Sequence, residues 1–443
     1  MALDVVGITQ RNTYGTWRHQ RGWKPLHIVG ADGCHFTDAS GKRYLDFSSQ
    51  LMCSTLGHGN KAVVEAICEQ ARTLPYIGPQ FATTARAQLS ELLLEVLPKG
   101  LTKYFFTTSG TEANEAAFRI ARLVTGKHKI ISRYTSYHGS TAGSIAATGD
   151  VRRWLVEPTG KIDGVIFGPE CNCYRCPLGK EYPGCDVACA DYIEYMIKNE
   201  ANVAAVVVEP IVGTNGVLVP PDEYLPRLVE IAHRYGVLVI ADEVMSGWGR
   251  TGSWFAVDHW GVRPDILTTA KGITGAFVPL GLTATSQAIA DYFDDHYFPL
   301  GHTYEAHPMT IGPAVAAIRE LRDRKLVERA RTLGETLGAK LRALAPKHRS
   351  IGDVRGRGLF WALDLVRDRA TREPFSVPSD KIERKPMLID KVTADLMQRG
   401  VFVMGWISHL IVAPPLIVSE AELDQGLAAI DAALAIADAE VPK

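Results

Sequence analysis

The sequence has no excess of charge of either sign, no long apolar run and few cysteines. Its 443 residues carry 48 Lys and Arg against 49 Asp and Glu, so no overall field favours nucleic acid or a lipid surface. No window approaches the ~18 apolar residues of a membrane-spanning helix, and no apolar stretch follows a basic start at the N-terminus. Eight cysteines are too few for a disulfide framework at this length. These absences predict a small-molecule partner, a cytoplasmic location and no contact with membrane or nucleic acid.

The composition that remains is that of a folded protein. Hydrophobic residues make up 46% of the chain and charged residues 22%, which is enough apolar surface for a sizeable core. The length predicts two to four units, or one large core with an accessory lobe. There is no internal repeat and no low-complexity segment.

Between about residues 100 and 330, strand-like apolar runs alternate with helix-like stretches. The strand-like runs are rich in β-branched residues and cover 103–109, 128–134, 203–210, 236–244 and 264–271. Helical spacing of apolar residues is found over 110–126, 189–199 and 221–236. Runs that are apolar on both faces and joined through helices predict an α/β fold with a mostly parallel sheet. In such a sheet, ligands bind at the carboxyl ends of the strands.

The flanking segments have a different pattern. Residues 1–60 resemble short antiparallel strands with turns at Asp32-Gly33 and Ser40-Gly41. We interpret 1–60 and 326–443 as one smaller α+β lobe, built from both termini, beside a large domain over 61–325. The cleft between the lobe and the sheet is the expected site. Within the C-terminal flank, helices are expected over 326–345, 386–400 and 419–438, with a strand pair over 352–366.

Three features at the strand ends have complementary chemistry. Asp242 follows an apolar strand, so its carboxylate should emerge at the carboxyl edge of the sheet. Lys271 ends another strand, and an apolar cleft lowers a lysine pKa as a Schiff-base nucleophile requires. Ser109, Gly110 and Thr111 join a strand to a helix whose first N–H groups can hold a phosphate. Each feature alone has an ordinary structural explanation. Together they are the fixed points of pyridoxal 5′-phosphate (PLP).

Six motifs carry a family resemblance. They are SGTEANEAA (109–117), YHG (137–139), VVVEP (206–210), IADEVMSGWGRTG (240–252), TTAKGITGAFVPLG (268–281) and HTYEAHP (302–308). In this order they resemble the class III, or omega-type, aminotransferases, and the resemblance extends from 45–60 to 413–424. It implies the fold-type I architecture of PLP-dependent transferases and a homodimer or a dimer of dimers.

The resemblance also implies roles for individual residues. Lys271 would form the internal aldimine and carry the transferred proton, and Asp242 would pair with the pyridinium nitrogen of the cofactor. Tyr137 would stack on one face of the ring and Val244 would cover the other. Glu209 is expected near the ring, although a sheet-edge ion pair explains it as well. The remaining expected cofactor contacts are Ser109, Gly110, Thr111, His138 and, from the neighbouring subunit, Thr303.

The expected substrate pocket departs from the family pattern. Many amine:pyruvate members carry an arginine shortly before the PPL segment that binds the acceptor carboxylate, and this chain has Met404 there. Trp406, Ser408 and His409 could supply a substitute acceptor-binding group or form a packed loop. The expected pocket wall consists of Leu51, Met52, Cys53, Met404 and, from the partner subunit, Gln80 and Phe81.

Five of the eight cysteines lie within residues 171–189. Cys173-x-x-Cys176 has metal-ligand spacing, and Cys185 and Cys189 could complete four thiolates. PLP chemistry needs no metal, so we expect none at the active site. The cysteines could equally pack as small hydrophobes or form a disulfide. The sequence leaves these alternatives open.

The residues and the resemblance together predict a PLP-dependent transaminase. It would move an amino group from an ω-amino acid or primary amine to a keto acid, with pyruvate expected, through a Lys271 aldimine and a pyridoxamine phosphate intermediate. An aminomutase or racemase on the same fold is the alternative. A nucleotide-binding ATPase is excluded because Gly126-Lys127 and the other Gly-Lys pairs lack the context of a phosphate loop. Lys271, Asp242 and Tyr137 argue against a catalytically silent protein.

Overall fold

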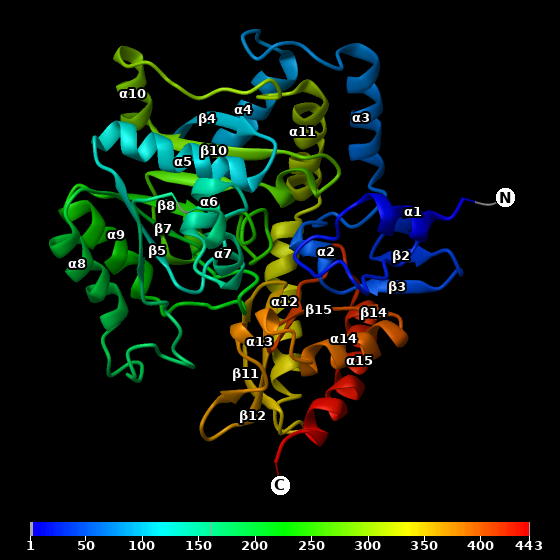
Figure 1. Ribbon diagram of the computed structural model, residues 1–443. Helices are drawn as coiled ribbons and strands as arrows, with labels where there is room; N and C mark the ends of the chain where they lie inside the picture. The colour runs from blue at the N-terminus through cyan, green and yellow to red at the C-terminus, as the bar shows by residue number, and fades with distance from the viewer. Residues whose placement is uncertain (1–2, 161, 443) are drawn as a thin grey trace.

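A seven-stranded, mostly parallel sheet forms the centre of the computed structural model, which describes residues 3–160 and 162–442. The strand order is β4–β10–β9–β8–β7–β5–β6 (Figure 1). β10 (Gly281–Ser286) is antiparallel to both neighbours, and the other strands run in one direction. The α/β prediction with a mostly parallel sheet is therefore confirmed. The parallel strands are β4 (Leu101–Thr107), β5 (Lys129–Arg133), β6 (Val165–Gly168), β7 (Val203–Val208), β8 (Leu238–Asp242) and β9 (Ile266–Thr269).

Helices cover both faces of the central sheet, as the apolar character of its strands requires. Alternate residues of β7 and β8 pack into two different clusters. Val207 and Ile240 pack with Phe118 of α5 (Gly110–Thr125). Val206 and Val239 belong to the cluster that contains Leu228 of α9 (Tyr224–Arg234). α8 (Ala188–Glu200) packs against α9 and β6.

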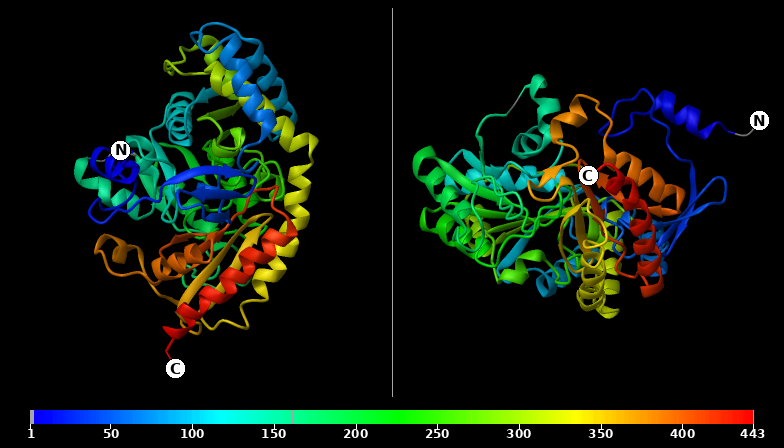
Figure 2. Two further views of the ribbon diagram at one scale, coloured as in Figure 1. Left: turned by 90° about the vertical axis from the view of Figure 1, so that its right-hand side faces the viewer. Right: turned by 90° about the horizontal axis from the view of Figure 1, so that it is seen from below.

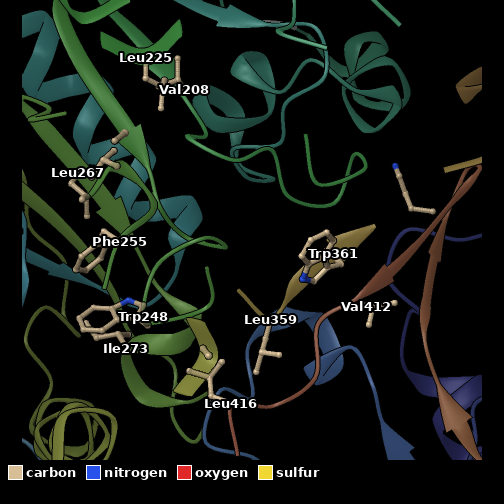
Figure 3. Packing of buried hydrophobic residues seen from close by; sticks show 14 of the residues in the cluster. Val208, Leu225, Trp248, Phe255, Leu267, Ile273, Leu359, Trp361, Val412 and Leu416 are labelled. Carbon is tan, nitrogen blue, oxygen red and sulfur yellow. The ribbon is translucent and has the colours of Figure 1, made fainter. Parts of the chain in front are cut away.

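The larger apolar cluster extends from the sheet into the C-terminal part of the chain. Figure 3 shows Trp248 beside Phe255 and Ile273, and Leu416 near Leu359. The Trp248 side chain is fully buried, and its Nε1 donates to Thr269 Oγ1 at 2.7 Å. Burial of each large apolar side chain contributes about 1.5–3 kcal/mol. The two parts of the molecule thus share one packed interior.

Segments from both ends of the chain lie side by side. β1 (Ile28–Asp32), β2 (His35–Asp38) and β3 (Arg43–Asp46) form an antiparallel sheet, which β14 (Val401–Phe402) extends in parallel with Leu45 opposite Val401 (Figure 1). The boundaries at residues 60 and 325 stay a prediction, and residues 1–2 and 443 lie outside the described ranges. A third sheet holds β11 (Ile351–Arg357), β12 (Phe360–Asp368), β16 (His409–Val412) and β15 (Met404–Trp406), with β13 (Glu373–Pro374) paired to β12.

The remaining helices frame these sheets. α12 (Leu326–Arg342) and α15 (Glu420–Ala439) run beside each other along one edge of the molecule (Figure 2). Within the described ranges, no helix combines the length and apolarity that a bilayer crossing needs. The other helices are α1 (Val5–Asn12), α2 (Ser49–Met52), α3 (Lys61–Thr73), α4 (Thr84–Val96), α6 (Ala142–Ala147), α7 (Val151–Val156), α10 (Gln287–Asp295), α11 (Pro308–Asp323), α13 (Pro378–Ile382) and α14 (Leu388–Gln398).

A buried arginine joins the central sheet region to both terminal segments. Arg250 follows β8, and its Nη1 donates to the carbonyl oxygens of Leu359 at 3.1 Å and Pro414 at 2.6 Å. Its Nη2 donates to Ser49 Oγ at 3.0 Å. Burial lowers the pKa of Arg250 to about 10, so the guanidinium remains charged at neutral pH. Its planar fork is what allows it to reach three separate acceptors.

We expect Arg250→Lys to destabilise the protein, because one ammonium cannot reproduce the fork and leaves buried acceptors unpaired. The expected loss in free energy of unfolding is about 2–4 kcal/mol, given about 1–3 kcal/mol for each buried unsatisfied group. Urea unfolding followed by circular dichroism measures it. Arg331→Lys on the exposed side of α12 is the matched control and should change stability by less than about 0.5 kcal/mol. Equal losses in the two variants would contradict the assigned role.

Candidate active site

A cavity of about 520 Å³ opens at the carboxyl edge of the central sheet. Its walls are the segments that follow β4, β5, β7, β8 and β9, where parallel strands bring their ends together. Residues far apart in the sequence thus border one space. Those that the sequence analysis had selected are Cys53, Ser109, Gly110, Thr111, Tyr137, His138, Glu209, Asp242, Val244 and Lys271.

Asp242 is the last residue of β8, and its buried carboxylate holds three segments together. Its Oδ2 accepts hydrogen bonds from Asn114 Nδ2 at 2.8 Å and His138 Nδ1 at 2.7 Å. Its Oδ1 accepts from the backbone N–H of Val244 at 3.0 Å. Asn114 lies on α5, and His138 lies in the loop after β5, so this carboxylate positions both relative to β8. His138 Nε2 is buried with no hydrogen-bond partner among the described residues.

The next residue, Glu243, does not border the cavity. Its Oε1 accepts from the backbone N–H of Val257 at 2.8 Å, and its Oε2 accepts from Ser246 Oγ. Burial raises the pKa of Glu243 to about 7. Of the two adjacent acids, Asp242 therefore borders the cavity, whereas Glu243 binds Ser246 and Val257 behind it.

Lys271 follows β9 and borders the cavity in a constrained backbone conformation. Its φ is 50°, in the left-handed region that a non-glycine residue seldom adopts. A Cβ at Gly272 would lie 2.6 Å from Trp248 Cβ, so the turn needs glycine there. Burial lowers the pKa of Lys271. The positive charge of Arg152 also lowers it, whereas nearby acidic groups raise it. The ε-amine is thereby brought closer to a neutral form.

The N-terminus of α5 forms the opposite end of the cavity. Ser109 caps the helix, because its Oγ accepts from the backbone N–H of Glu112 at 3.2 Å. Gly110 and Thr111 then have first-turn N–H groups with no intrahelical acceptor. A Cβ at Gly110 would lie 2.7 Å from Val244 Cγ2, so only glycine permits this close approach. The helix dipole and the N–H groups together favour an anion such as phosphate.

Glu209 follows β7 and supports the loop that carries Tyr137. Its Oε1 accepts from the backbone N–H of Tyr137 at 3.0 Å, and its Oε2 accepts from that of Gly213 at 2.8 Å. Burial raises the pKa of Glu209 to about 7. Arg133 donates to the backbone carbonyl of Glu209 at 2.7 Å, while its ion pair is with Glu170 at 2.9 Å. Within the described ranges no ion pair involves the Glu209 carboxylate.

An arginine that the sequence analysis did not select stacks on Tyr137. The guanidinium carbon of Arg152 lies 3.7 Å from the centroid of the Tyr137 ring and 4.6 Å from that of Trp406. Asp150 binds the Nε and Nη2 of Arg152. The third nitrogen, Nη1, has no hydrogen-bond partner within the described part of the chain. Arg152 thus contacts the Tyr137 ring that borders the cavity, although Arg152 does not itself line the cavity.

The residues expected in the substrate pocket lie in different places. Cys53 borders the cavity, whereas Met52 is 2% exposed in a separate apolar cluster against which Met404 packs. Leu51 is 60% exposed. Gln80, Phe81 and Thr303 are exposed and do not border the cavity of their own chain. We had expected these three from a partner subunit.

Ser408 and His409 are occupied by structural contacts. Ser408 Oγ donates to the backbone carbonyl of Ser376 at 3.0 Å, and His409 Nε2 lies 3.3 Å from Asp364 Oδ2. Trp406 Nε1 donates to Asn215 Oδ1 at 2.9 Å. These contacts are those of a packed loop, the alternative to an acceptor-binding group at these residues.

Asn114 is the clearest site residue that the sequence analysis missed. Its Nδ2 also donates to the backbone carbonyl of His138 at 2.7 Å, and its Oδ1 accepts from Thr268 Oγ1 at 2.7 Å. The signal was present, because Asn114 is a polar residue on the otherwise apolar buried face of α5. The other lining residues that we did not select are Thr108, Gly139, Thr214, Met245, Ala270 and the segment 276–280.

The cavity has the polar groups that PLP requires. The α5 N-terminus suits the phosphate, the buried Asp242 carboxylate suits a protonated ring nitrogen, and Lys271 suits the aldehyde. Because Gly110 carries no side chain, the first turn of α5 packs directly against Val244 at the cavity wall. The donor set therefore fits the cofactor predicted from the sequence.

Comparison with known proteins agrees with this geometry. The family model for aminotransferase class-III matches residues 18–434. A leucine/methionine racemase of Thermococcus litoralis is 35% identical over 93% of this chain and 91% of its own length. A taurine–pyruvate aminotransferase of Rhodobacter capsulatus is 35% identical over 97% of each chain. The solved structure of taurine:2-oxoglutarate aminotransferase from Bifidobacterium kashiwanohense, in complex with PLP and glutamate, has a TM-score of 0.94 at 35% identity and covers 99% of this chain and 98% of its own.

We expect Glu243→Gln to flatten the dependence of stability on pH. The folded pKa of about 7 exceeds the unfolded value of ~4.3, so the folded state binds more protons and wild-type stability falls as pH rises between them. The free energy of unfolding of the variant minus that of wild type should therefore be up to about 3 kcal/mol greater at pH 8 than at pH 4.5. Its amide can donate to Ser246 and accept from Val257.

Urea unfolding at the two pH values measures this difference. Glu230→Gln is the matched control, because the Glu230 side chain is 69% exposed on α9 and its removal should leave the pH profile unchanged. A Glu243→Gln variant whose profile follows that of wild type would contradict the raised pKa.

Proposed function

The chain belongs to the class III aminotransferase family and is a PLP-dependent transaminase, and from this premise we propose that it transfers the amino group of an ω-amino acid to pyruvate. The observation that carries the proposal is the position of Arg152, stacked on Tyr137 and close enough to lower the pKa of Lys271. This cation suits a substrate with an anionic group remote from its amine. The name of the Rhodobacter relative, a taurine–pyruvate aminotransferase, supports both the donor class and the acceptor.

The residues around the cavity hold the cofactor and keep it dry. When bound, PLP supplies the electron sink that stabilises negative charge on the substrate carbon. Gly110 and Thr111 bind its phosphate through backbone N–H groups at the α5 N-terminus. Tyr137 and Val244, which both line the cavity, would cover the two faces of the cofactor ring. Asp242 would hold a proton at the ring nitrogen, and Asn114 and His138 hold the Asp242 carboxylate in place.

Lys271 moves the proton that transamination requires. Its Nζ takes a proton from the amine-bearing carbon of the donor and later returns one to the acceptor carbon. A base with this role needs a pKa near the working pH, and burial lowers the pKa of Lys271 toward it. The strained backbone at Lys271 and the close contact of Gly272 with Trp248 hold the amine in one position.

Arg152 replaces the cation that this chain lacks at Met404. Met404 packs against the apolar cluster around Met52 and offers nothing to a carboxylate. Arg152 has two nitrogens fixed by Asp150 and Nη1 left for a ligand, so its orientation is set before substrate binds. Trp406 stacks on the same guanidinium. The anionic end of the donor, and the carboxylate of pyruvate in turn, bind here.

The enzyme works as a cytoplasmic homodimer in this proposal. Phe81 is 53% exposed, and Thr303 lies beside the exposed aromatic rings of Tyr76 and Tyr304. An exposed aromatic patch of this kind is typical of a protein interface. Gln80, Phe81 and Thr303 then reach the cavity of the partner subunit. All eight cysteines are free thiols, as is usual in a reducing compartment.

A racemase is the second candidate, because the Thermococcus relative carries that name. The two activities differ in the half-reaction. A transaminase releases a carbonyl product from the donor alone, in an amount equal to the enzyme, whereas a racemase releases none. We expect release with taurine and β-alanine, followed by alanine formation when pyruvate is added. Chromatography of both products measures this, and inverted L-alanine without any carbonyl release would favour the racemase. Faster turnover with 2-oxoglutarate than with pyruvate would contradict the acceptor.

We expect Arg152→Gln to discriminate between donors. The KM for taurine and β-alanine should rise about 10–100-fold, since a hydrogen bond to a charged group contributes about 1.5–3 kcal/mol. The KM for n-butylamine, which has no anionic end, should change by less than about threefold. Arg152→Lys keeps the charge and should recover part of the loss. Equal losses with charged and uncharged donors would contradict anion binding by Arg152 while leaving the transaminase assignment intact.

A further inference from the structure

Five cysteines outside the active site border one small cavity. The cavity measures about 20 Å³, room for about one water molecule, and most of its lining residues belong to the segment between β6 and α8. Cys171 is 3% exposed and Cys189 is 8% exposed, whereas Cys173 is exposed to solvent. The transaminase chemistry uses none of them. The lining cysteines are Cys171, Cys173, Cys176, Cys185 and Cys189.

Only some of these thiols interact with one another. The Cys171 thiol lies close enough to Cys173 and to Cys189 to lower the pKa of both. Cys176 and Cys185 border the same cavity but are not part of this contact. No group of three or more Cys, His, Asp or Glu side chains in residues 3–160 and 162–442 is arranged to hold a metal ion. The arrangement is therefore that of a thiol pair with a third thiol behind it.

The loop that carries the pair is fixed from both sides. The Arg175 guanidinium binds both carboxylate oxygens of Asp364 on β12 at 2.8 Å. The backbone N–H of Cys171 donates to Glu170 Oε1 at 2.9 Å, and Glu170 is ion-paired with the buried Arg133. These contacts fix the backbone on both sides of Cys173. Two thiols held together react with each other faster than thiols on a mobile loop.

The two thiols differ in protonation and access. The hydrogen bond from Cys171 lowers the pKa of Cys173 to about 7, whereas hydrogen bonds and burial raise the pKa of Cys171. Cys173 is thus partly thiolate at neutral pH and open to solvent, which is the condition for reaction with an oxidant. Cys171 stays a protonated thiol beside it.

We propose that Cys173 and Cys171 form a redox-sensitive pair that hydrogen peroxide converts to a disulfide. The Cys173 thiolate attacks one peroxide oxygen, the O–O bond breaks, and the leaving hydroxide takes a proton to become water. The Cys171 sulfur then attacks the Cys173 sulfenic acid, the S–O bond breaks, and hydroxide leaves with the Cys171 proton as a second water. Two thiols lose two electrons, and one peroxide gains them.

Peptide mapping of the holoenzyme tests the pairing, because trypsin separates the cysteines. Cleavage after Arg175 and Lys180 places Cys171 and Cys173 together in peptide 162–175, Cys176 in 176–180, and Cys185 and Cys189 in 181–198. After treatment with one equivalent of hydrogen peroxide and alkylation of the remaining thiols, we expect peptide 162–175 to lack both alkyl groups and two hydrogen atoms. Reduction before alkylation should restore the reduced mass and both alkylation sites.

Two variants distinguish the proposal from its competitors. Cys173→Ser should abolish the disulfide, and Cys176→Ser, the matched control, should leave it unchanged. A cross-link between peptides 162–175 and 181–198 would overturn the pairing, because Cys171 or Cys173 would then be joined to Cys185 or Cys189. Stable sulfinic acid at Cys173, or one equivalent of bound zinc that blocks oxidation, would also overturn it. Transaminase turnover with β-alanine, measured in parallel, shows that each variant is folded.

Discussion

The geometry of the active site depends on one buried carboxylate. Asp242 lies at the end of β8, where it accepts hydrogen bonds from α5, from the loop after β5 and from the backbone that follows it. A buried charge of this kind is stable only when its acceptor positions are filled. The same contacts that stabilise Asp242 therefore place the phosphate end of the cavity and the Tyr137 loop relative to the ring nitrogen. Lys271, one strand away, completes the arrangement.

Much of this arrangement could be predicted from the sequence, because local pattern and chemistry coincide at the strand ends. Apolar β-branched runs located β4, β5, β7, β8 and β9 to within a few residues. Parallel strands put their carboxyl ends at one edge, so Ser109, Asp242 and Lys271 had to lie near one another. Glu243 shows the limit of this reasoning. It is equally acidic and equally close to the strand end, yet its side chain binds Ser246 and Val257 on the other side.

The features that were missed depend on contacts between distant segments. Arg152 lies in a short helix with no local signal, and its position comes from Tyr137, Asp150 and Trp406 together. The antiparallel strand β10 has the sequence GLTATS, whose alternating threonines weaken the apolar pattern of a buried strand. The cysteine spacing left a metal site, a packed cluster and a disulfide open, and the fold places all five cysteines at one small cavity, where no group of three or more ligand side chains in the described residues is arranged to hold a metal ion. Spacing along the chain alone did not determine which thiols meet.

The parallel pairing of β3 with β14 also constrains how the protein is made. Leu45 leaves the ribosome about 350 residues before its partner Val401. At about 5–20 residues per second, this interval lasts roughly 20–70 s. Throughout it, β3 is an open strand edge beside apolar side chains that have no cover, a state prone to wrong pairing with other nascent chains. Vectorial synthesis thus leaves the outer edge of β3 without its partner strand until β14 has been made.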